Sequence, residues 1–433
     1  MPNLDPYVAS LLAIENDIAA GRLQEAAAAL APLQGTHPND PRVYMLEGMR
    51  ANAAQQPKRA MDALQRALAL APDWSLPHME LALCLSRLGN HDAAVREANK
   101  AVALAPNETT VLETAVSVAL AAGNRDIAER HLQSAHSQWP NNMEIRRILA
   151  ICMTNNGHQQ DAIPHWQALL EKDPHDAVAL GCLGECLLAT GRSSEGKAIL
   201  EQAVTAAPDN EVLRFHLAIA RGETPPTQPL QMTVELFDRY AGYFDKQLVG
   251  KLKYRLPRRV AEILHARYPD RHLSVLDLGC GTGLTGVYLG KISGPLIGVD
   301  VSSKMLDQAA KHRVYTTLRQ NDLLAELRET AADTYDCVTA NDVFIYVGDL
   351  SEVIPAVFPV VRKGGVFIFS CESADEGEGD LVLRPSKRYA HSRSSIERLC
   401  QAAGFGTYTI EPIDLRFDNT VAIAGFIAVV EKA

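Results

Sequence analysis

The residue types best suited to chemistry in this chain gather between Val275 and Gly283, which read VLDLGCGTG. An apolar run ends near Asp277, and glycines follow at alternate positions, Gly279, Gly281 and Gly283. Alternate glycines at a strand-to-helix turn let the backbone approach a ligand with no side chain in between. The carboxylate of Asp277 stands two positions before the first glycine, where it can meet a cationic or amine-bearing ligand.

A second acidic residue strengthens this interpretation. Asp300 lies near the end of the apolar stretch Pro295–Val301, and the separation from the glycine run is the roughly 20 residues at which a carboxylate accepts both hydroxyls of a ribose. Together the two features predict a site for an adenosine-type cofactor. The alternative is a tight turn of an α/β sheet that binds nothing.

The stretch 275–283 resembles motif I of the class I S-adenosylmethionine-dependent methyltransferases. VDVSSKMLDQA, residues 299–309, resembles their second strand and the helix that follows it, and the resemblance extends over roughly 233–433. It implies S-adenosylmethionine as the cofactor and no metal. In that family Asp277 and the glycines would hold the amino-acid end of the cofactor, and Asp300 would hold the ribose.

The same resemblance assigns further positions by alignment. They are Ser302 and Met305 beside the adenosine, Asp322 and Leu323 at the adenine, Asn341 and Asp342 where the acceptor approaches the methyl group, and Tyr240 at the methionine carboxylate. Tyr240 belongs to an aromatic-rich amphipathic segment, so the alternative for it is a stripe that packs a helix on the sheet. The neighbouring Tyr254 and Arg255 are a further candidate pair.

The acceptor side is predicted from position along the chain. NDVFIYVGDL brings Tyr346 toward the mouth of the site beside Asp342, and the polar segment 383–392 is expected to be a loop over the strand ends. In that loop His391 would take a proton from a hydroxyl or amine acceptor, unless it merely caps the next helix. Its cations, Arg384, Lys387 and Arg388, would instead bind an anionic acceptor such as a carboxylate, which needs no base.

Alternating strand and helix signals predict an α/β fold for this half of the chain. The first strand is expected to be the apolar run that begins at Val275 and ends at the acidic residue before the glycines, and others are expected near 295–301, 314–319, 335–340 and 365–371. Two long β-rich runs follow, 407–416 and 421–431, with no helix between them. The methyltransferase resemblance implies a Rossmann-like, seven-stranded mixed sheet in the order 3-2-1-4-5-7-6. Motif I, Asp300, Asp322 and Asn341 then share the carboxyl edge of the sheet.

The first half of the chain is a repeat. Prolines recur every 34 residues from Pro38 to Pro208, and turn glycines share the period. This is the tetratricopeptide period, one pair of helices per unit. We expect six repeats over 7–210 and a capping helix at 211–220, with a distorted turn in the second repeat, where Gln55 replaces the glycine. The predicted domains are 1–220, an all-α solenoid; 221–232, a proline-bearing linker; and 233–433.

Composition limits the remaining possibilities. With 433 residues, 47% of them hydrophobic and a net charge of −10, the chain is expected to be globular and multidomain, with no nucleic-acid partner. No apolar run is long enough to span a membrane, and no segment resembles a secretion signal. The eight cysteines have neither zinc nor disulfide spacing, which indicates a reduced cytoplasmic protein.

The whole pattern resembles bacterial methyltransferases that carry tetratricopeptide repeats. It predicts a methyltransferase acting on a small-molecule or carrier-linked acceptor, at oxygen more than nitrogen, whose repeats recruit a protein partner or the carrier. One alternative is a protein or peptide methyltransferase that holds its substrate in the groove of the repeats. Another is a non-catalytic scaffold. The sequence names neither the acceptor, the partner, nor the oligomeric state.

Overall fold

A computed structural model describes residues 5–241, 254–375, 377–418 and 421–433. The chain divides into two compact units, Met1–Ala207 and Pro208–Ala433. Helix α13 (Glu211–Ala220), which we expected to cap the repeats, falls within the second unit, and so does the linker 221–232. The unit that carries the glycine turn therefore begins upstream of the expected domain start at residue 233.

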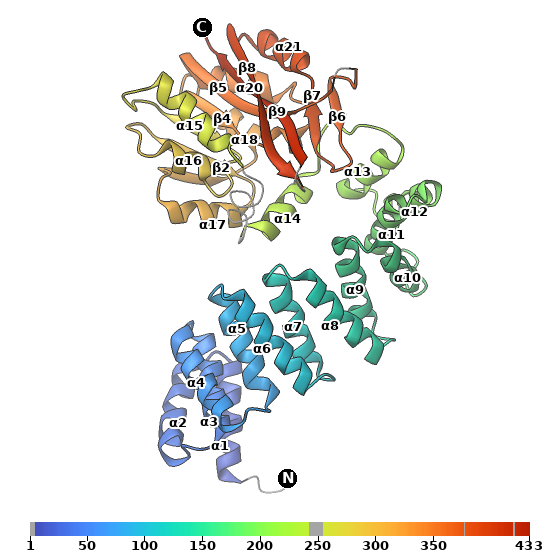
Figure 1. The fold of residues 1–433 in the computed structure, drawn as a ribbon, viewed down its shortest axis with the longest axis vertical. Helices are drawn as coiled ribbons and strands as arrows, with labels where there is room; N and C mark the ends of the chain where they lie inside the picture. The colour runs from blue at the N-terminus through green and yellow to red at the C-terminus, as the bar shows by residue number, and fades with distance from the viewer. Residues whose placement is uncertain (1–4, 242–253, 376, 419–420) are drawn as a thin grey trace. The chain divides into compact units, whose positions relative to one another are not determined.

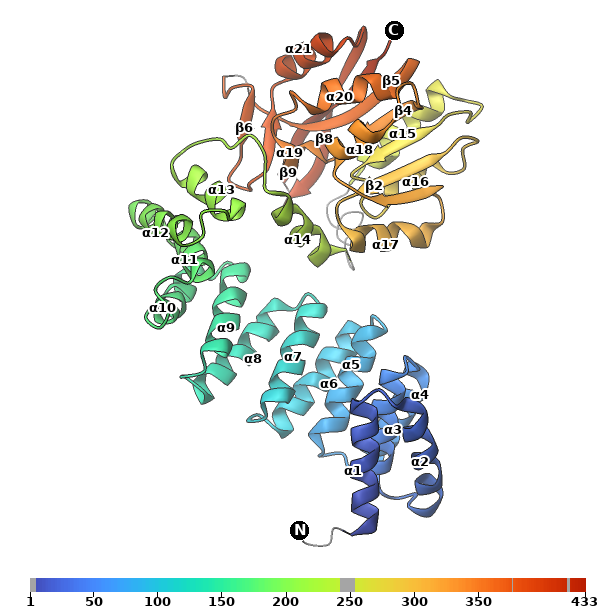
Figure 2. The same cartoon turned by 180° about the vertical axis from the view of Figure 1, so that it is seen from behind.

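The described part of the first unit consists of α-helices that follow one another in pairs, each pair forming one hairpin (Figure 1). The same succession of hairpins is visible from behind (Figure 2). In chain order they are α1 (Pro6–Ala19), α2 (Leu23–Thr36), α3 (Pro41–Ala53), α4 (Pro57–Leu70), α5 (Ser75–Arg87), α6 (His91–Leu104), α7 (Thr109–Ala121), α8 (Arg125–Gln138), α9 (Met143–Asn156), α10 (Gln159–Leu170), α11 (Ala177–Ala189) and α12 (Ser193–Ala206).

Small residues explain how closely the paired helices pack. The second helix of every pair carries one at the same position of the 34-residue period, and each is buried: Ala26, Ala60, Ala94, Ala128, Ala162 and Gly196. At the last of these positions a Cβ atom would come within 2.9 Å of the Gly184 carbonyl oxygen on the facing helix. The predicted repeat register is therefore confirmed by the packing.

The turn of the second repeat is regular, so our prediction of a distortion there is wrong. Gln55 adopts a left-handed backbone with φ of 55°, close to the 74° of Gly89 at the equivalent turn of the next repeat. In both turns the following amide donates to the carbonyl oxygen five residues earlier at 2.9 Å. The Gln55 side chain is exposed and meets no obstacle. Gln55 therefore adopts the left-handed backbone conformation that glycine adopts more readily.

Replacing Gln55 with glycine is expected to stabilise the first unit by about 1 kcal/mol, because the left-handed region costs a residue with a side chain roughly that much. Chemical denaturation followed by far-ultraviolet circular dichroism measures the change in the free energy of unfolding. The reciprocal change Gly89→Gln is the matched control and should destabilise by a similar amount. A Gln55→Gly variant no more stable than the wild type would contradict the regular turn.

The second unit is an α/β domain. Its strands are β1 (Val275–Leu278), β2 (Leu296–Asp300), β3 (Thr317–Gln320), β4 (Tyr335–Ala340), β5 (Val361–Ser373), β6 (Leu381–Leu383), β7 (Tyr389–His391), β8 (Thr407–Asp418) and β9 (Val421–Glu431). After α13, its helices are α14 (Leu230–Tyr240), α15 (Leu256–Arg267), α16 (Leu284–Leu289), α17 (Ser303–His312), α18 (Leu323–Glu329), α19 (Phe344–Val347), α20 (Val353–Val360) and α21 (Arg393–Ala403).

The sheet has the predicted order among its long strands. Strands β3, β2, β1, β4 and β5 are parallel neighbours, and β9 lies antiparallel between β5 and β8. Counting β8 and β9 as the sixth and seventh strands gives 3-2-1-4-5-7-6. The difference from our expectation is a short antiparallel hairpin, β6–β7, that extends the end of β5 through the pairs Glu372↔Ala390 and Ser373↔His391. The predicted polar loop 383–392 is therefore part of a hairpin.

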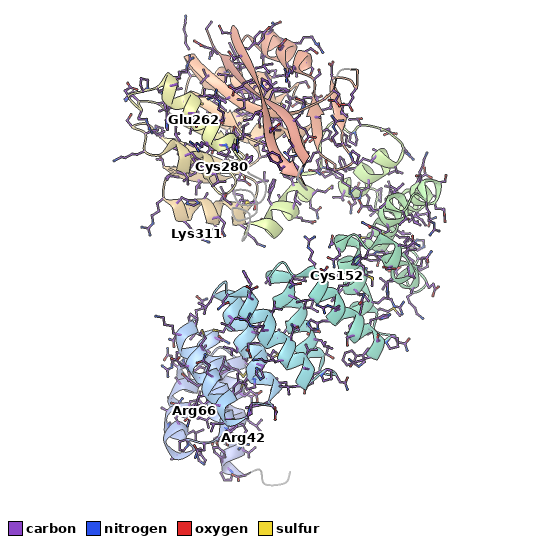
Figure 3. The ribbon with its side chains drawn as sticks, in the orientation of Figure 1. Arg42, Arg66, Cys152, Glu262, Cys280 and Lys311 are labelled. Atoms are coloured by element: carbon purple, nitrogen blue, oxygen red, sulfur yellow. The ribbon has the colours of Figure 1, made fainter. Side chains whose placement is uncertain are left out.

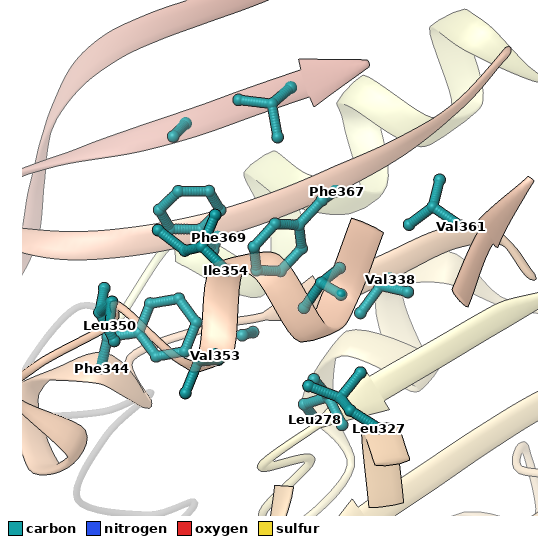
Figure 4. Close-up of a cluster of buried hydrophobic side chains, with 14 of the residues drawn as sticks. Leu278, Leu327, Val338, Phe344, Leu350, Val353, Ile354, Val361, Phe367 and Phe369 are labelled. Atoms are coloured by element: carbon teal, nitrogen blue, oxygen red, sulfur yellow. The ribbon is translucent and has the colours of Figure 1, made fainter. Parts of the chain in front are cut away.

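Alternate strand residues fill two separate cores, one on each face of the sheet. On one face, Phe367 and Phe369 of β5 stack with ring centroids 4.5 Å apart and meet Phe344 of α19 (Figure 4). On the other face, Val366 and Ile368 of β5 pack with helices α15 and α16. This alternation along one strand is what a sheet covered by helices on both sides requires.

The linker folds onto the second unit. The carbonyl oxygen of Pro226 accepts the amide of Asp349 at 2.7 Å, and that of Pro225 accepts the Tyr389 hydroxyl at 2.8 Å. At Gly348 a side chain would collide with the Pro226 carbonyl. The segment is thus fixed to α19 and the added hairpin. Among the residues that the structure covers, no helix has the length and apolar character needed to cross a bilayer.

Candidate active site

A cavity of about 910 Å³ opens at the carboxyl edge of the sheet in the second unit. Its floor is the loop between β1 and α16, marked by Cys280 in Figure 3, together with the ends of β2, β3 and β4. Its other walls come from the linker, α14, Tyr254, Arg388 beside β7, and Arg416 of β8. A cavity at this edge is where ligands bind in open α/β sheets.

The three glycines of the β1–α16 loop serve different purposes. All have positive φ, 63° for Gly279, 55° for Gly281 and 87° for Gly283. Only at Gly281 would a Cβ atom point into open space. At Gly279 it would collide with Val343, and at Gly283 it would come within 2.9 Å of the Tyr315 ring. Our expectation that a ligand excludes all three side chains therefore needs correction: packing within the protein excludes a side chain at Gly279 and Gly283, although Gly279 lines the cavity together with Gly281.

Asp277 lies beneath this loop rather than in the cavity wall. It is 1% exposed, and its Oδ2 accepts the Tyr315 hydroxyl at 2.6 Å. Burial raises the pKa of the Asp277 carboxyl to about 7, against the lowering effect of the Tyr315 hydrogen bond. The structure thus places Asp277 under the glycine loop, one layer behind the cavity surface.

Tyr315 is a residue that the sequence-based predictions missed. Its ring fills a slot that exists because three neighbours lack side chains: a Cβ atom at Gly283, Gly286 or Gly298 would approach it to 2.8–2.9 Å. The Gly286 amide also donates to the Tyr315 hydroxyl at 3.3 Å. The glycine at 298, in the middle of a buried strand, was the only signal of this close approach.

Asp300 lines the cavity at the end of β2 with its carboxylate held in place. Its two oxygens accept the amides of Gly281 and Ser302, both at 2.9 Å. Burial is the main influence on this carboxyl and raises its pKa, while the backbone hydrogen bonds lower it. Ser302 itself is fully buried as the N-cap of α17 and donates to Asp238 of α14 at 2.6 Å. Ser302 and Met305, also fully buried, do not line the cavity.

Four of the predicted residues line the cavity just after β3 and β4: Asp322, Leu323, Asn341 and Asp342. Asp322 is the N-cap of α18. The side-chain nitrogen of Asn341, Nδ2, donates to the hydroxyl oxygens of Thr339 at 2.8 Å and Thr285 at 3.3 Å. Its buried Oδ1 has no hydrogen-bond partner among the described residues. An unpaired buried acceptor beside a cavity is a position where a ligand can donate.

Beginning at Asp342, the residue after Asn341, the cavity wall contains a chain of paired charges. Arg416 of β8 is 4% exposed, and it donates to Asp342 at 2.8 Å and to Glu372 at 3.0 Å. Asp342 has a left-handed backbone, with φ of 59°, and its amide donates to the Ser370 hydroxyl oxygen at 2.8 Å. Arg416 was not among the predicted site residues, although an arginine within the apolar run of a strand indicates a buried partner.

Tyr346 and Tyr254 form the aromatic side of the cavity, which agrees with the predicted position of Tyr346 at its mouth. Phe237 of α14 packs edge-on against the Tyr346 ring, with centroids 5.2 Å apart. Burial is the main cause that raises the pKa of both tyrosines, so both phenols stay protonated at neutral pH. The side chain of Tyr240 lies outside the described residues.

His391 is not in the cavity, so our prediction of it as a proton acceptor for the substrate is wrong. As part of β7 it is 3% exposed, and its Nε2 contacts the Gly348 carbonyl oxygen at 2.6 Å. Burial lowers its pKa. Of the three cations predicted nearby, Arg384 pairs with Glu378 at 2.6 Å and Lys387 contacts His216 at 3.2 Å; only Arg388 lines the cavity.

Comparison with known proteins agrees with this geometry. Residues 275–365 match the family model of the methyltransferase domain. This chain carries a methyltransferase domain. Residues 78–108 and 157–220 match models of the tetratricopeptide repeat, so the predicted combination of the two is confirmed. The second of these matches extends through α13, the helix that packs in the same unit as the methyltransferase domain.

Relatives in the curated set match the methyltransferase half. A ubiquinone biosynthesis O-methyltransferase of Hydrogenovibrio crunogenus is 31% identical over 149 residues, which are 33% of this chain and 58% of that protein. A malonyl-[acyl-carrier protein] O-methyltransferase of Pseudescherichia vulneris is 28% identical over 174 residues, 39% of this chain and 68% of that protein. This chain thus spans little more than half of the first relative.

Among solved structures, the tetratricopeptide protein YrrB, described as having an unusual peptide-binding site, has a TM-score of 0.38 and 19% identity. The aligned region covers 43% of this chain and 96% of the YrrB chain.

The buried Asp277 makes the stability of the methyltransferase domain depend on pH. Its folded pKa of about 7 lies above the unfolded value of 3.8, so the folded carboxyl binds its proton more tightly. The stability that it contributes is complete below about pH 4 and is lost as the pH rises through about 7, a loss on the order of a few kcal/mol. Replacing Asp277 with asparagine removes this titration, and the Tyr315 hydroxyl can still donate to the amide oxygen.

We therefore expect Asp277→Asn to gain stability relative to the wild type between pH 5 and pH 8. Thermal unfolding across that range measures the difference in melting temperature at each pH. Asp307→Asn, an exposed position on α17, is the matched control and should leave the wild-type pH profile unchanged. If the melting temperatures of Asp277→Asn and the wild type differed by the same amount at every pH, a raised pKa at Asp277 would be refuted.

Proposed function

We propose that this protein is an S-adenosylmethionine-dependent methyltransferase that acts on a small-molecule or carrier-linked acceptor, at oxygen. The observation that carries the proposal is the cofactor side of the cavity. There a bare backbone position at Gly281 lies beside the fixed carboxylate of Asp300 and the unpaired Oδ1 of Asn341.

The residues present fit this cofactor group by group. Asp300 lines the cavity with two oxygens that each accept one backbone amide, which leaves lone pairs for the two ribose hydroxyls. The unpaired oxygen of Asn341 is an acceptor for the ammonium group of the methionine part. Gly281 leaves open the space that a side chain would fill. Asp322 and Leu323 line the wall where the adenine would lie.

When bound, S-adenosylmethionine supplies a methyl group on a positively charged sulfur. The protein's own contribution is to orient the acceptor and to exclude water, which is what an in-line displacement needs. Tyr254, Tyr346 and Phe237 provide apolar walls, and the linker covers the site at Pro226–Leu230. The volume of about 910 Å³ lies near the upper end for ligand sites and accommodates an acceptor beside the cofactor.

The choice of oxygen is supported by the relatives, since both curated relatives described above are named as O-methyltransferases. One of them is named for an acyl-carrier-protein substrate, which makes a carrier-linked acceptor a reasonable expectation for this chain as well. We propose further that the repeats bind a protein partner or the carrier, as arrays of this kind offer extended concave surfaces. Eight unpaired cysteines support a location in the reducing cytoplasm.

Isothermal titration with S-adenosylmethionine, followed by transfer of its labelled methyl group to acceptors in a cell extract, tests the proposal. Binding at micromolar concentration and transfer are expected. A protein that binds no cofactor would favour the scaffold alternative. Fragment 208–433, which is the second compact unit, distinguishes a small-molecule methyltransferase from one that holds a protein substrate in its repeats. Activity of the fragment on small acceptors supports our proposal. Activity of the full chain alone supports a substrate held by the repeats.

Replacing Asp300 with alanine is expected to weaken cofactor binding by about 1–3 kcal/mol, roughly ten- to hundredfold, because hydrogen bonds to a charged group are lost. Titration calorimetry of the variant measures the change in Kd. Asp307→Ala, an exposed aspartate on the following helix, is the matched control and should bind as the wild type does. Equal affinity of the Asp300 variant and the wild type would remove Asp300 from the ribose site.

A further inference from the structure

The acceptor side of the cavity holds a cation that differs from its neighbours. Arg388 and Tyr346 both line the cavity. Burial acts to lower the pKa of the Arg388 guanidinium group, but the nearby Tyr346, Asp342 and Glu372 raise it overall. Within the described parts of the chain, no carboxylate lies within ion-pair distance of Arg388. Its N–H donors are therefore available to a ligand, and the planar guanidinium group suits two parallel hydrogen bonds to a carboxylate.

The nearby arginines are already paired. Arg416 is held between Asp342 and Glu372 at 2.8 and 3.0 Å, and Arg384 pairs with Glu378 at 2.6 Å. Each of these positive charges is balanced by a carboxylate of the protein itself. Among the described residues, Asp342 and Glu372 act on Arg388 electrostatically but form no close ion pair with it. Arg388 is thus the arginine of this wall whose guanidinium group can form a close pair with a negatively charged ligand.

Of the groups that commonly remove a proton from an alcohol or an amine, the described lining of the cavity provides only carboxylates and tyrosines, among them Asp322, Asp349 and Glu352. Its described lining contains neither histidine nor lysine. His391 is occupied by the Gly348 carbonyl, and Asp342 is fixed by Arg416. The hydroxyls of Tyr254 and Tyr346 remain protonated and act as donors. An acceptor that is already ionised at neutral pH fits this environment, because it needs no base.

We infer that the methyl acceptor is a carboxylic acid, bound as its carboxylate by the guanidinium group of Arg388 and the hydroxyl of Tyr346. This inference rests on the proposed function. One carboxylate oxygen forms a bond to the methyl carbon while the bond from that carbon to sulfur breaks and its electron pair stays on sulfur. The products are a methyl ester and S-adenosylhomocysteine. No proton is transferred, so the charges and atoms balance without a base.

The first test uses the chemistry of the product. Full-length protein is incubated with methyl-labelled S-adenosylmethionine and an extract of the source cells, and the labelled products are then treated with mild alkali. A methyl ester releases its label as volatile methanol, whereas ethers, N-methyl groups and methyl phosphates keep theirs. Base-volatile label is the expected result. Base-stable label would overturn the carboxylate inference and leave the proposed function intact, while no transfer at all would overturn both.

The second test concerns Arg388 itself. Arg388→Ala should raise the KM for the labelled acceptor at least about tenfold, because the buried anion loses its charged partner, and should leave the calorimetric Kd for S-adenosylmethionine unchanged. Arg388→Lys, which keeps the charge without the planar pair of donors, should be intermediate. Arg398→Ala, which removes an exposed arginine paired with Asp380 outside the cavity, is the matched control.

Two readouts separate a binding role from a structural one. An unchanged cofactor Kd in Arg388→Ala shows that the domain is folded, and direct titration of the acceptor acid into protein saturated with S-adenosylhomocysteine measures acceptor binding without turnover. Equal acceptor affinity in Arg388→Ala and the wild type would overturn the role of Arg388. A variant that fails to bind cofactor is replaced by Arg388→Lys for the same titration.

Discussion

The site depends on one buried hydrogen bond, from the Tyr315 hydroxyl to the Asp277 carboxylate, at 2.6 Å. It lies beneath the loop that forms the cavity floor, and the ring of Tyr315 is wedged among positions where three glycines leave no side chains. The loop therefore rests on a rigid support rather than on a ligand. Because a protein interior is densely packed, a shift of this ring would move the Gly281 backbone and the carboxylate of Asp300 that it holds.

The two sides of the cavity use opposite means to place polar groups. On the side where we propose that the cofactor binds, backbone amides hold Asp300 and side-chain hydroxyls hold Asn341, so the positions are set by the strands themselves. On the side where we propose that the acceptor binds, Arg416 of β8 pairs with Asp342 after β4 and with Glu372 at the end of β5, so one ion-pair chain joins three strands. A buried pair of this kind costs desolvation energy and fixes geometry in return.

The sequence predicts the fold well because the signals are periodic. The 34-residue spacing predicted the positions of the helix pairs, and apolar runs predicted the positions of β1, β2 and β4 closely. Strand β3 begins later than the expected start at residue 314. Local chemistry identified Asp300, and the family resemblance assigned Asp322 and Asn341; all three line the cavity. Tyr315, Arg416 and the β6–β7 hairpin could not be predicted from neighbours in sequence, because each is defined by contacts with distant segments. The prediction for His391 failed for the same reason: pairing with β5 buries it.

The linker has a consequence for how such proteins can be taken apart. Pro226–Leu230 is a side wall of the cavity, and the carbonyl oxygens of Pro225 and Pro226 in the linker accept hydrogen bonds from the rest of the second unit. A protease nick or an inserted tag at this proline-rich stretch would breach the pocket instead of releasing two intact halves. Exchange of one repeat array for another, whether by evolution or by engineering, is therefore constrained to join upstream of it.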